Sequence, residues 1–306
     1  MIGIDVGGAN LKIADEKGVH IHYCPLWKES PLAELLSGYE SDNAAVVMSG
    51  ELADGFYNKA EGIAFIVDAV KKTFPDALFY GTDGAFHKDA CPALAAANWL
   101  ASVSYLKKKY PDGMMLDIGS TTADIVPFAG FENLIGMTDT LRLQKGYLVY
   151  TGMLRSPVAA LASFAVINGI ETPFSSEYFA CSGDVHFVLG HITKEEYTAA
   201  TPDGKEVFRE ACLRRLARTV CADLEEIGEA GAVAIAEAVW TKQKKLVCDA
   251  VSRVKEKTGA DTVLVGGIGA KTFAPLAGGI DLERELQIPA DALPAYAVLK
   301  LASEDI

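Results

Sequence analysis

IGIDVGGANLK, residues 2–12, joins a short apolar run to an aspartate, two glycines, an asparagine and a lysine. The pattern predicts a strand that ends near Asp5, a turn, and a second strand that carries Lys12. Glycine lets backbone N–H groups approach a ligand closely, so such a turn can hold phosphate oxygens. A single turn of this kind is equally typical of a tight hairpin. The turn residues that we expect to contact a ligand are Gly7, Gly8 and Asn10.

The same pattern returns about 110 residues later in GMMLDIGSTTADIVPF, residues 113–128. An apolar strand again runs through an aspartate, Asp117, into a glycine turn and a second strand. This repetition predicts two related halves, each with its own sheet and helices. A third glycine turn follows a buried-strand pattern in TVLVGGIGA, residues 262–270. The expected ligand contacts in the second and third turns are Gly119, Ser120, Thr121, Thr122, Gly266, Gly267 and Gly269.

Two aspartates at strand ends are more specific than one glycine turn. Facing carboxylates of Asp5 and Asp117 can hold Mg²⁺ through its waters, while glycine amides take the phosphates. Lys12 would add positive charge and the hydroxyls of the second turn would add hydrogen bonds to the anion. The alternative for Lys12 is an exposed strand residue, because polar and apolar positions alternate around it.

Several side chains are candidates for proton transfer or for orienting a substrate. Asp124 in TTAD lies close in sequence to the second turn, whereas Asp83 in GTDG, Asp184 and His186 depend on the fold to reach it. Arg155 in TGMLRSPV can clamp a phosphate or a carboxylate, and its alternative is a surface arginine. The spacing of the histidines does not match a metal motif, so we expect them to bind no metal.

The periodicity of apolar residues predicts an α/β protein of two domains with a cleft between them. The first domain should cover residues 1–111 and the final helix, 294–306, and the second should cover 112–293. Each should contain a mixed sheet flanked by helices. Three strands are expected within residues 1–24, further strands at 44–50 and 77–81, and helices at 63–74, 92–107, 205–228, 231–257 and 293–303.

Composition narrows the function. The 306 residues carry a net charge of -13, so we expect no nucleic acid partner. Neither a signal peptide nor a membrane span is visible, which predicts a cytoplasmic protein without a membrane partner. The six cysteines form no C-x-x-C pair, and we expect reduced thiols. The tryptophans, Trp27, Trp99 and Trp240, are expected in the core, and a homo-oligomer is compatible with the sequence.

The three glycine turns resemble, in the same order, the phosphate 1, phosphate 2 and adenosine motifs of the actin, sugar kinase and Hsp70 superfamily. The resemblance implies the two-domain, ribonuclease H-like fold of the actin-like ATPases. Within it, DVGGANLK, DIGSTTADIVP, YLVYTGMLRSPV and GDVHFVLGHI are similar to the hydantoinase and oxoprolinase-like branch. They resemble most narrowly an archaeal family of methanofuran-biosynthesis enzymes, also described as tetrahydromethanopterin-linked C1 transfer proteins.

That resemblance implies a transferase that joins a furanmethyl diphosphate to the phenol of γ-glutamyltyramine and releases diphosphate. It implies Mg²⁺, held by Asp5 and Asp117, and it leaves ATP binding open. Two alternatives remain at this point. The three motifs fit an ATP-dependent kinase, with Asp83 as its base, or a hydantoinase-type ATP hydrolase, although such hydrolases are commonly longer. They also fit a non-enzymatic nucleotide switch, for which the sequence shows no added partner-binding segment.

Overall fold

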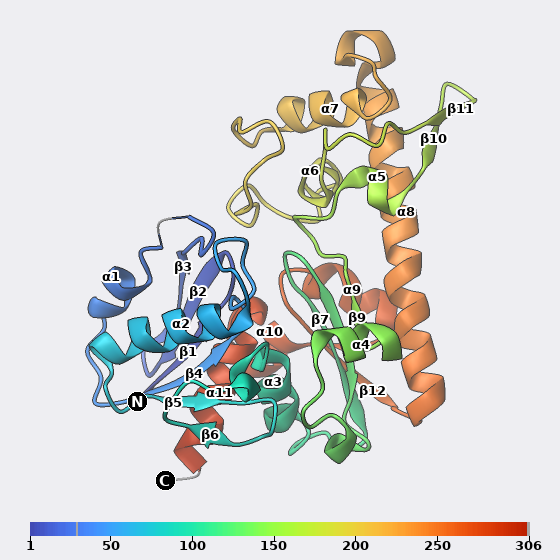
Figure 1. Cartoon of the computed structure of the whole chain (residues 1–306). Helices are drawn as coiled ribbons and strands as arrows, with labels where there is room; N and C mark the ends of the chain where they lie inside the picture. The colour runs from blue at the N-terminus through green and yellow to red at the C-terminus, as the bar shows by residue number, and fades with distance from the viewer. Residues whose placement is uncertain (29, 305–306) are drawn as a thin grey trace.

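The computed structural model describes residues 1–28 and 30–304 and shows two mixed sheets flanked by helices (Figure 1). The first sheet has the strand order β3-β2-β1-β4-β5-β6 and the second has the order β13-β12-β7-β8-β9. The first contains β1 (Ile2–Val6), β2 (Asn10–Asp15), β3 (Gly18–Tyr23), β4 (Ala44–Met48), β5 (Leu78–Tyr80) and β6 (Phe86–His87). The second contains β7 (Gly113–Ile118), β8 (Ala123–Pro127), β9 (Leu148–Val149), β12 (Thr262–Gly266) and β13 (Ile280–Asp281).

The two sheets repeat one topology, as the doubled motif predicts. In each, a hairpin is followed by a parallel strand that adds to its first strand: β4 lies beside β1, and β12 lies beside β7. The turns of the two hairpins close in the same way. The Gly7 N–H donates to the carbonyl of Asn10 at 3.0 Å, and the Gly119 N–H donates to the carbonyl of Thr122 at 3.0 Å. The repeated sequence pattern therefore encodes a repeated backbone.

Helices cover both faces of the first sheet. The helices α1 (Leu32–Ser37) and α2 (Lys59–Thr73) share one apolar core with β1, β2 and β4. On the other face lie α3 (Asn98–Leu106) and the last helix, α11 (Leu293–Glu304), which packs directly on β1. A side chain at Gly3 would place its Cβ 2.1 Å from the carbonyl oxygen of Ala295. The chain thus returns to the first sheet at its end.

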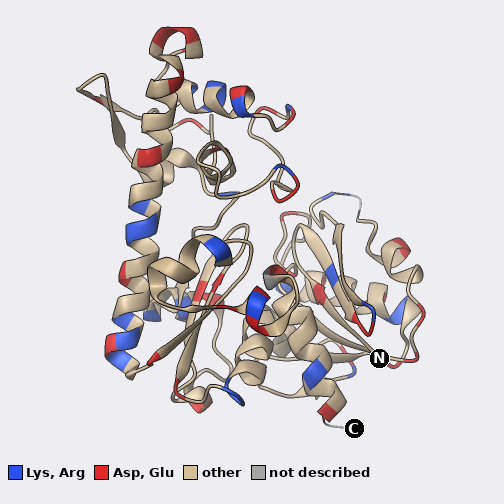
Figure 2. Ribbon diagram, turned by 180° about the vertical axis from the view of Figure 1, so that it is seen from behind, with Lys and Arg blue, Asp and Glu red and all other residues tan. Residues whose placement is uncertain are grey.

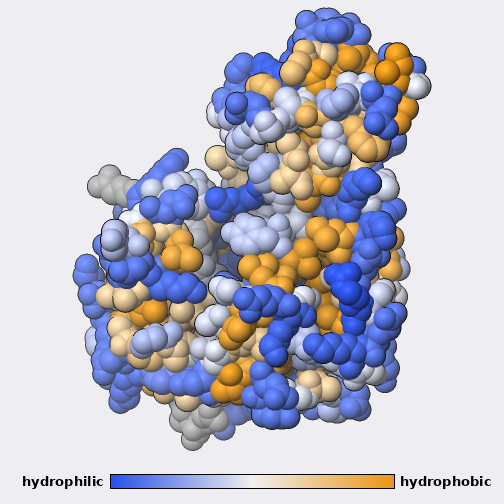
Figure 3. Space-filling model, turned by 45° about the vertical axis from the view of Figure 1, so that its right-hand side comes forward, coloured by the Kyte–Doolittle hydropathy of each residue, from blue (hydrophilic) through white to orange (hydrophobic). Residues whose placement is uncertain are grey.

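The second sheet continues into a lobe that the sequence did not reveal. The long helix α8 (Leu224–Thr258) packs on β8 with its later turns, while its first turns stand clear of the sheet (Figure 1). A break at Gly228 interrupts the helix, and at 1.5 Å per residue the part from 229 to 258 spans about 45 Å. An outer lobe surrounds the first turns of α8, and a notch separates this lobe from the first half of the molecule in Figure 3. It contains α5 (Val158–Leu161), β10 (Phe164–Ile167), β11 (Ile170–Pro173), α6 (Ser182–Val188) and α7 (Arg209–Arg218).

The remaining elements join these parts. They are α4 (Asp139–Lys145), α9 (Ala270–Ala277), α10 (Leu282–Leu286) and three short 3₁₀ turns, η1 (Pro92–Leu94), η2 (Phe131–Asn133) and η3 (Ala290–Ala292). One apolar cluster runs from α3 and α11 through the second sheet to the outer lobe. A continuous core therefore fixes the position of the second sheet against the helices beneath the first.

The prediction of a single helix over 205–228 was wrong. The helix α7 ends at Arg218, and Cys221 adopts a left-handed φ of 59° in the turn that follows. Asp223 then caps the next helix by accepting from the N–H of Glu226 at 2.7 Å. A second break falls at Gly228, where φ is 69° inside α8. Apolar spacing continues across both breaks, so it did not mark them.

Within the described residues, no helix is long and apolar enough to cross a membrane. All six cysteines are free thiols, as expected. Trp99 is buried in the core, and Trp240 packs edge-on against Phe273. Trp27 and Trp240 are both half-buried, but Trp240 packs against the core, whereas Trp27 lies on the loop after β3 and belongs to neither apolar cluster, contrary to the expectation.

Candidate active site

The first glycine turn places the carboxylate of Asp5 beside the ammonium of Lys12. Asp5 and Lys12 are direct partners in the β1–β2 hairpin, so their side chains project from the same face. The Lys12 ammonium lies 3.5 Å from one Asp5 oxygen, and the Asp5 side chain is only 2% exposed. Gly7 and Gly8 are half-buried, and a side chain at Gly8 would meet open space. The turn therefore leaves room for a ligand above this pair.

The second and third turns meet at Asp117. Its β7 strand pairs in parallel with β12, where Gly266 is the direct partner of Asp117. The next residue, Gly267, has a φ of 78°, and a Cβ there would fall 2.4 Å from an Asp117 carboxylate oxygen. Only glycine permits this close approach of backbone to carboxylate. The turn residues Gly119, Ser120, Thr121 and Thr122 are all half-buried beside it.

Acidic residues from both halves act on the charge of Lys12. Burial opposes the ammonium form of Lys12, but the carboxylates of Asp5, Asp291 and Asp117 outweigh that effect and raise the pKa of Lys12. Asp291 lies in η3, which packs against both β2 and β12. Lys12 from the first half thus lies within the field of an acid from the second. The structure brings together the predicted residues Asp5, Lys12 and Asp117.

Burial raises the pKa of Asp5, and Lys12 opposes that effect. Burial and the neighbouring Asp124 raise the pKa of Asp117 to about 7. Both carboxylates therefore lack sufficient positive charge to compensate for their burial. One oxygen of Asp5 is buried and has no hydrogen-bond partner in residues 1–28 and 30–304. A bound cation would supply the missing interaction.

These residues fit a magnesium ion shared with a substrate. Among the described residues, no group of three or more His, Cys, Asp or Glu side chains could hold a metal. Mg²⁺ in phosphate sites commonly uses only one or two carboxylates, with waters and phosphate oxygens as its other ligands. The unpartnered oxygen of Asp5 and the carboxylate of Asp117 meet that smaller requirement.

Asp124 is held by an arginine. It is the direct partner of Asp117 in the β7–β8 hairpin, and the Arg142 guanidinium donates to its carboxylate. Arg142 also donates to Asp139 at 2.7 Å and lies over the ring of Trp99, 4.6 Å from its centroid. Burial raises the pKa of Asp124 despite this arginine. Figure 2 shows acidic positions in red on the central strands of this second sheet.

The loop in YTGMLRSPV braces the second turn. The N–H of Met153 donates to the carbonyl of Gly119 at 2.9 Å. Two further N–H groups, of Leu154 and Arg155, donate to the carbonyl of Ser120 at 3.0 Å each. Gly152 packs so tightly on the turn that a Cβ would fall 2.4 Å from the Thr121 nitrogen. This loop fixes the backbone that we expect to contact phosphate.

A buried polar chain supports that loop from below. Gln243 of α8 donates to the Thr151 hydroxyl and to the Gly152 carbonyl, both at 2.9 Å. Its own oxygen lies 2.9 Å from Nε2 of His186, whose Nδ1 lies 2.9 Å from Nδ1 of His191. The two histidines therefore have structural partners in this chain of hydrogen bonds.

Arg155 reaches across the boundary between the two halves. Its side chain is exposed, and its guanidinium lies over the ring of Trp27, 5.1 Å from the centroid. Trp27 lies on a loop of the first sheet and Arg155 on a loop of the second, so this stacking contact joins the halves beside the second turn. An exposed guanidinium at this position is suited to bind an anion.

The other candidate bases lie in different surroundings. Asp83 sits on an exposed turn, where its carboxylate is 2.9 Å from Nε2 of His87, and hydrogen bonding from His87 contributes to lowering its pKa against the effect of burial. Asp184 is buried in the outer lobe and accepts from Arg215 at 2.8 Å and from Tyr197 at 3.1 Å. Neither pairing joins these acids to the site formed by Asp5 and Asp117.

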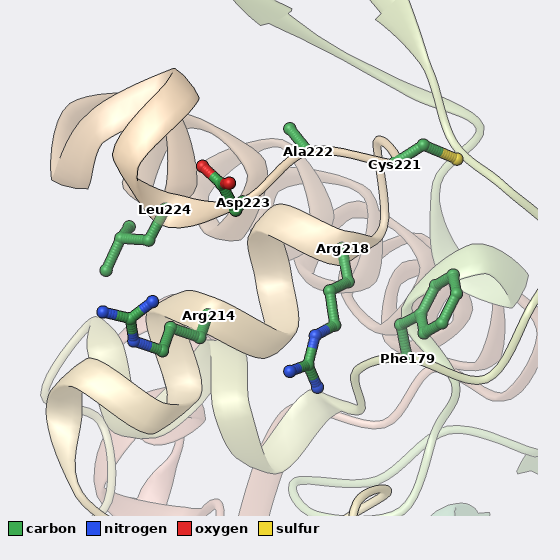
Figure 4. Close-up of a pocket in the computed structure, with 7 residues that line it drawn as sticks. All are labelled: Phe179, Arg214, Arg218, Cys221, Ala222, Asp223 and Leu224. Atoms are coloured by element: carbon green, nitrogen blue, oxygen red, sulfur yellow. The ribbon is translucent and has the colours of Figure 1, made fainter.

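The outer lobe also holds a cavity of about 390 Å³, shown in Figure 4. Two arginines line it, but Arg214 is paired with Glu210 and Glu225, and Arg218 lies 3.6 Å from Asp203. None of the residues predicted to contact a ligand lines this cavity.

Sequence reasoning missed several residues of the site. Asp291 could not be found because only the return of the chain brings it to Lys12. Arg142 and Gln243 carry no motif of their own. Glu51 had a usable signal, because it follows a buried parallel strand in AAVVMSGE, and ligand-binding residues gather beyond the carboxyl ends of parallel strands.

The hydantoinase/oxoprolinase family is recognised over residues 42–302, a range that includes the second and third glycine turns and begins after the turn that carries Asp5 and Lys12. The chain belongs to the hydantoinase/oxoprolinase family. The chain is similar to a protein of Methanocaldococcus jannaschii, 35% identical over 100% of this chain and 98% of the relative. That relative is named (4-{4-[2-(gamma-L-glutamylamino)ethyl]phenoxymethyl}furan-2-yl)methanamine synthase.

A second relative, from Methanococcus vannielii, bears the same name and is 32% identical over 57% of this chain and 79% of its own length. Among solved structures, nucleotide-free acetone carboxylase matches with a TM-score of 0.51 and 10% identity, over 97% of this chain and 69% of the other. At that identity the match shows the fold alone. It confirms the expected actin-like ATPase fold for this member of the hydantoinase/oxoprolinase family.

Proposed function

We propose that this protein is a transferase of methanofuran biosynthesis that joins an aminomethylfuran-methyl diphosphate to the phenol of γ-glutamyltyramine. The observation that carries the proposal is the pairing of Asp5 with Lys12 and their electrostatic link to Asp117 across the two halves. A relative that matches over the full chain and is named for an aryl ether of this kind supports the choice of substrates.

The reaction requires that the protein hold the diphosphate group of the donor and leave the furan methylene carbon accessible to the phenol. The furan ring can delocalise positive charge as its methylene carbon leaves diphosphate, so the protein chiefly stabilises the departing anion and excludes water. Mg²⁺ held by Asp5 and Asp117 would neutralise charge on the diphosphate. Lys12 and the backbone amides of the first and second turns orient the same anion.

The acceptor approaches from the side of Arg155. A guanidinium suits the carboxylate of the glutamyl group, and Trp27 offers an aromatic face beside it. The phenol oxygen attacks the methylene carbon, and the carbon–oxygen bond to diphosphate breaks with its electron pair on the leaving group. The proposed reaction does not require ATP. The transferred group is the aminomethylfuran-methyl group, so the enzyme would be a transferase of groups other than methyl.

The test is an incubation of the purified protein with Mg²⁺, the furanmethyl diphosphate and γ-glutamyltyramine. Ether and diphosphate should appear in equal amounts. Asp5→Asn and Asp117→Asn should each slow the reaction by at least about 10²-fold, because each removes charge compensation at the leaving group. A mixture with ATP that yields ADP and no ether would establish the kinase alternative instead.

A further inference from the structure

Glu51 lies beside the first glycine turn although no motif marks it. The β4 strand pairs in parallel with β1, with Met48 opposite Val6. Beyond the strand, the N–H groups of Ser49 and Gly50 donate to the carbonyl of Val6 at 3.0 and 3.1 Å. A Cβ at position 50 would fall 2.8 Å from the Gly7 carbonyl. The two residues before Glu51 therefore contact the turn that we expect to bind diphosphate.

The Glu51 carboxylate is buried and incompletely paired. The residue is 2% exposed, and its Oε2 has no hydrogen-bond partner among the described residues. Its Oε1 lies 3.6 Å from the ammonium of Lys59, which is 37% exposed. An unpaired buried carboxylate oxygen is costly, so a group of this kind calls for a functional explanation.

Its surroundings come from both halves of the molecule. Burial raises the pKa of Glu51. Hydrogen bonding from its own backbone and that of Ala96 and the charge of Lys59 on α2 oppose that effect, whereas Asp139 on α4 adds to it. The α4 helix belongs to the second half, so the charge of an acid from that half reaches Glu51. A carboxylate made more basic by its site is suited to accept a proton near neutral pH.

We propose that Glu51 is the general base that takes the proton of the acceptor phenol, an inference that rests on the proposed transferase function. The phenol O–H bond breaks and its proton passes to Oε2 of Glu51. The phenol oxygen uses the released electron pair to bond the furan methylene carbon. The bond from that carbon to diphosphate breaks, and diphosphate leaves with the electron pair.

The competing acids are already engaged. The Asp124 carboxylate accepts from Arg142, and the Asp83 carboxylate pairs with His87. Glu51 instead keeps an oxygen free to accept. The Lys59 ammonium lies 3.6 Å from the other oxygen, Oε1, and is 37% exposed, so its positive charge partly compensates the carboxylate form of Glu51.

The test compares Glu51→Gln with wild type on two acceptors, γ-glutamyltyramine and a ring-difluorinated analogue whose phenol is more acidic. Loss of a general base should lower kcat for the normal acceptor by about 10²- to 10⁴-fold. The analogue, already partly ionised near neutral pH, should recover at least about tenfold of that loss because it needs the base less. The acid limb of the wild-type pH–rate profile should disappear in the variant.

The matched control is Glu171→Gln, which changes an exposed glutamate on β11 far along the chain from the site. It should leave both rates unchanged. An equal loss on both acceptors with an unchanged pH profile would overturn the inference and leave Glu51 a structural residue. If Glu51→Gln does not fold, Glu51→Asp keeps the charge and must show the same selective recovery by the analogue. Absence of ether from the wild-type protein would instead refute the proposed function.

Discussion

Gly152→Ala tests whether the loop of residues 150–158 holds the backbone of the second turn in place. The new Cβ would lie 2.4 Å from the nitrogen of Thr121 and 2.5 Å from the carbonyl carbon of Ser120. Ordinary contact begins at 3.4 Å, so the loop and the turn must separate by about 1 Å. That movement would strain the three hydrogen bonds that hold the carbonyls of Gly119 and Ser120.

The expected cost has two parts. Overpacking of this size should lower the free energy of unfolding by about 1–3 kcal/mol. A displacement of about 1 Å in a group that positions substrate should lower kcat/KM by about 10²-fold. Stability is measured by urea unfolding, and kcat/KM by release of diphosphate at low substrate concentration in the presence of Mg²⁺.

Gly38→Ala is the matched control. Gly38 ends α1 with a φ of -75°, and a Cβ there would lie 3.5 Å from the carbonyl of Leu35, which is ordinary contact. It should change neither kcat/KM nor stability by a measurable amount. If Gly152→Ala behaves like Gly38→Ala in both assays, the loop does not brace the turn and the reasoning fails.

Three further predictions follow from the charges of the site. Lys12→Met should lower kcat/KM for diphosphate release by at least about 10²-fold, because it removes a cation from the leaving group, and an unchanged rate would exclude Lys12. Arg142→Met should lower the free energy of unfolding by about 3–5 kcal/mol, because it leaves the buried carboxylate of Asp124 without its cationic partner. In urea unfolding, the double variant with Asp124→Asn should recover part of that loss. Burial lowers the pKa of His186 from 6.5 to about 3, so its contribution to stability is complete above pH 6.5 and is lost as the pH falls towards 3. The difference is worth up to about 5 kcal/mol in acid titrations of unfolding, and His186→Gln should flatten it.

Much of the fold could be predicted because its signals are local. Asp5 with its glycine turn and Asp117 with the next are complete strand–turn–strand units, and the structure closes both with equivalent hydrogen bonds. The return of residues 293–303 as a helix was visible in their apolar spacing, and α11 packs on β1. Such features depend on neighbours a few residues apart.

The outer lobe and the charge pairs depend on distant contacts. The apolar spacing of 205–228 continues through a turn whose only local marks are Cys221 and Asp223. The partner of Asp124 is Arg142, and no spacing rule predicts that pairing. Trp27 was expected in the core, yet its ring meets Arg155 from the other half. These contacts join residues that are far apart in the chain, and the periodicity of a single sequence reports only on near neighbours.

The roles of the candidate bases and of the metal remain predictions. The structure pairs Asp83 with His87 and Asp124 with Arg142, while Oε2 of Glu51 has no hydrogen-bond partner in the part of the chain that the structure describes. Kinetics with the fluorinated acceptor separates these acids, because only the variant that lacks the true base should regain rate with a more acidic phenol.

The central claim is that the two strand-end turns hold a magnesium diphosphate between them. A crystal structure grown with Mg²⁺ and diphosphate tests it most directly. We expect the anion between the turns at Gly7–Gly8 and Gly119–Thr122, with the metal within reach of Asp5 and Asp117. Diphosphate bound instead in the cavity beside Arg214 and Arg218, with those two aspartates free of metal, would contradict the account.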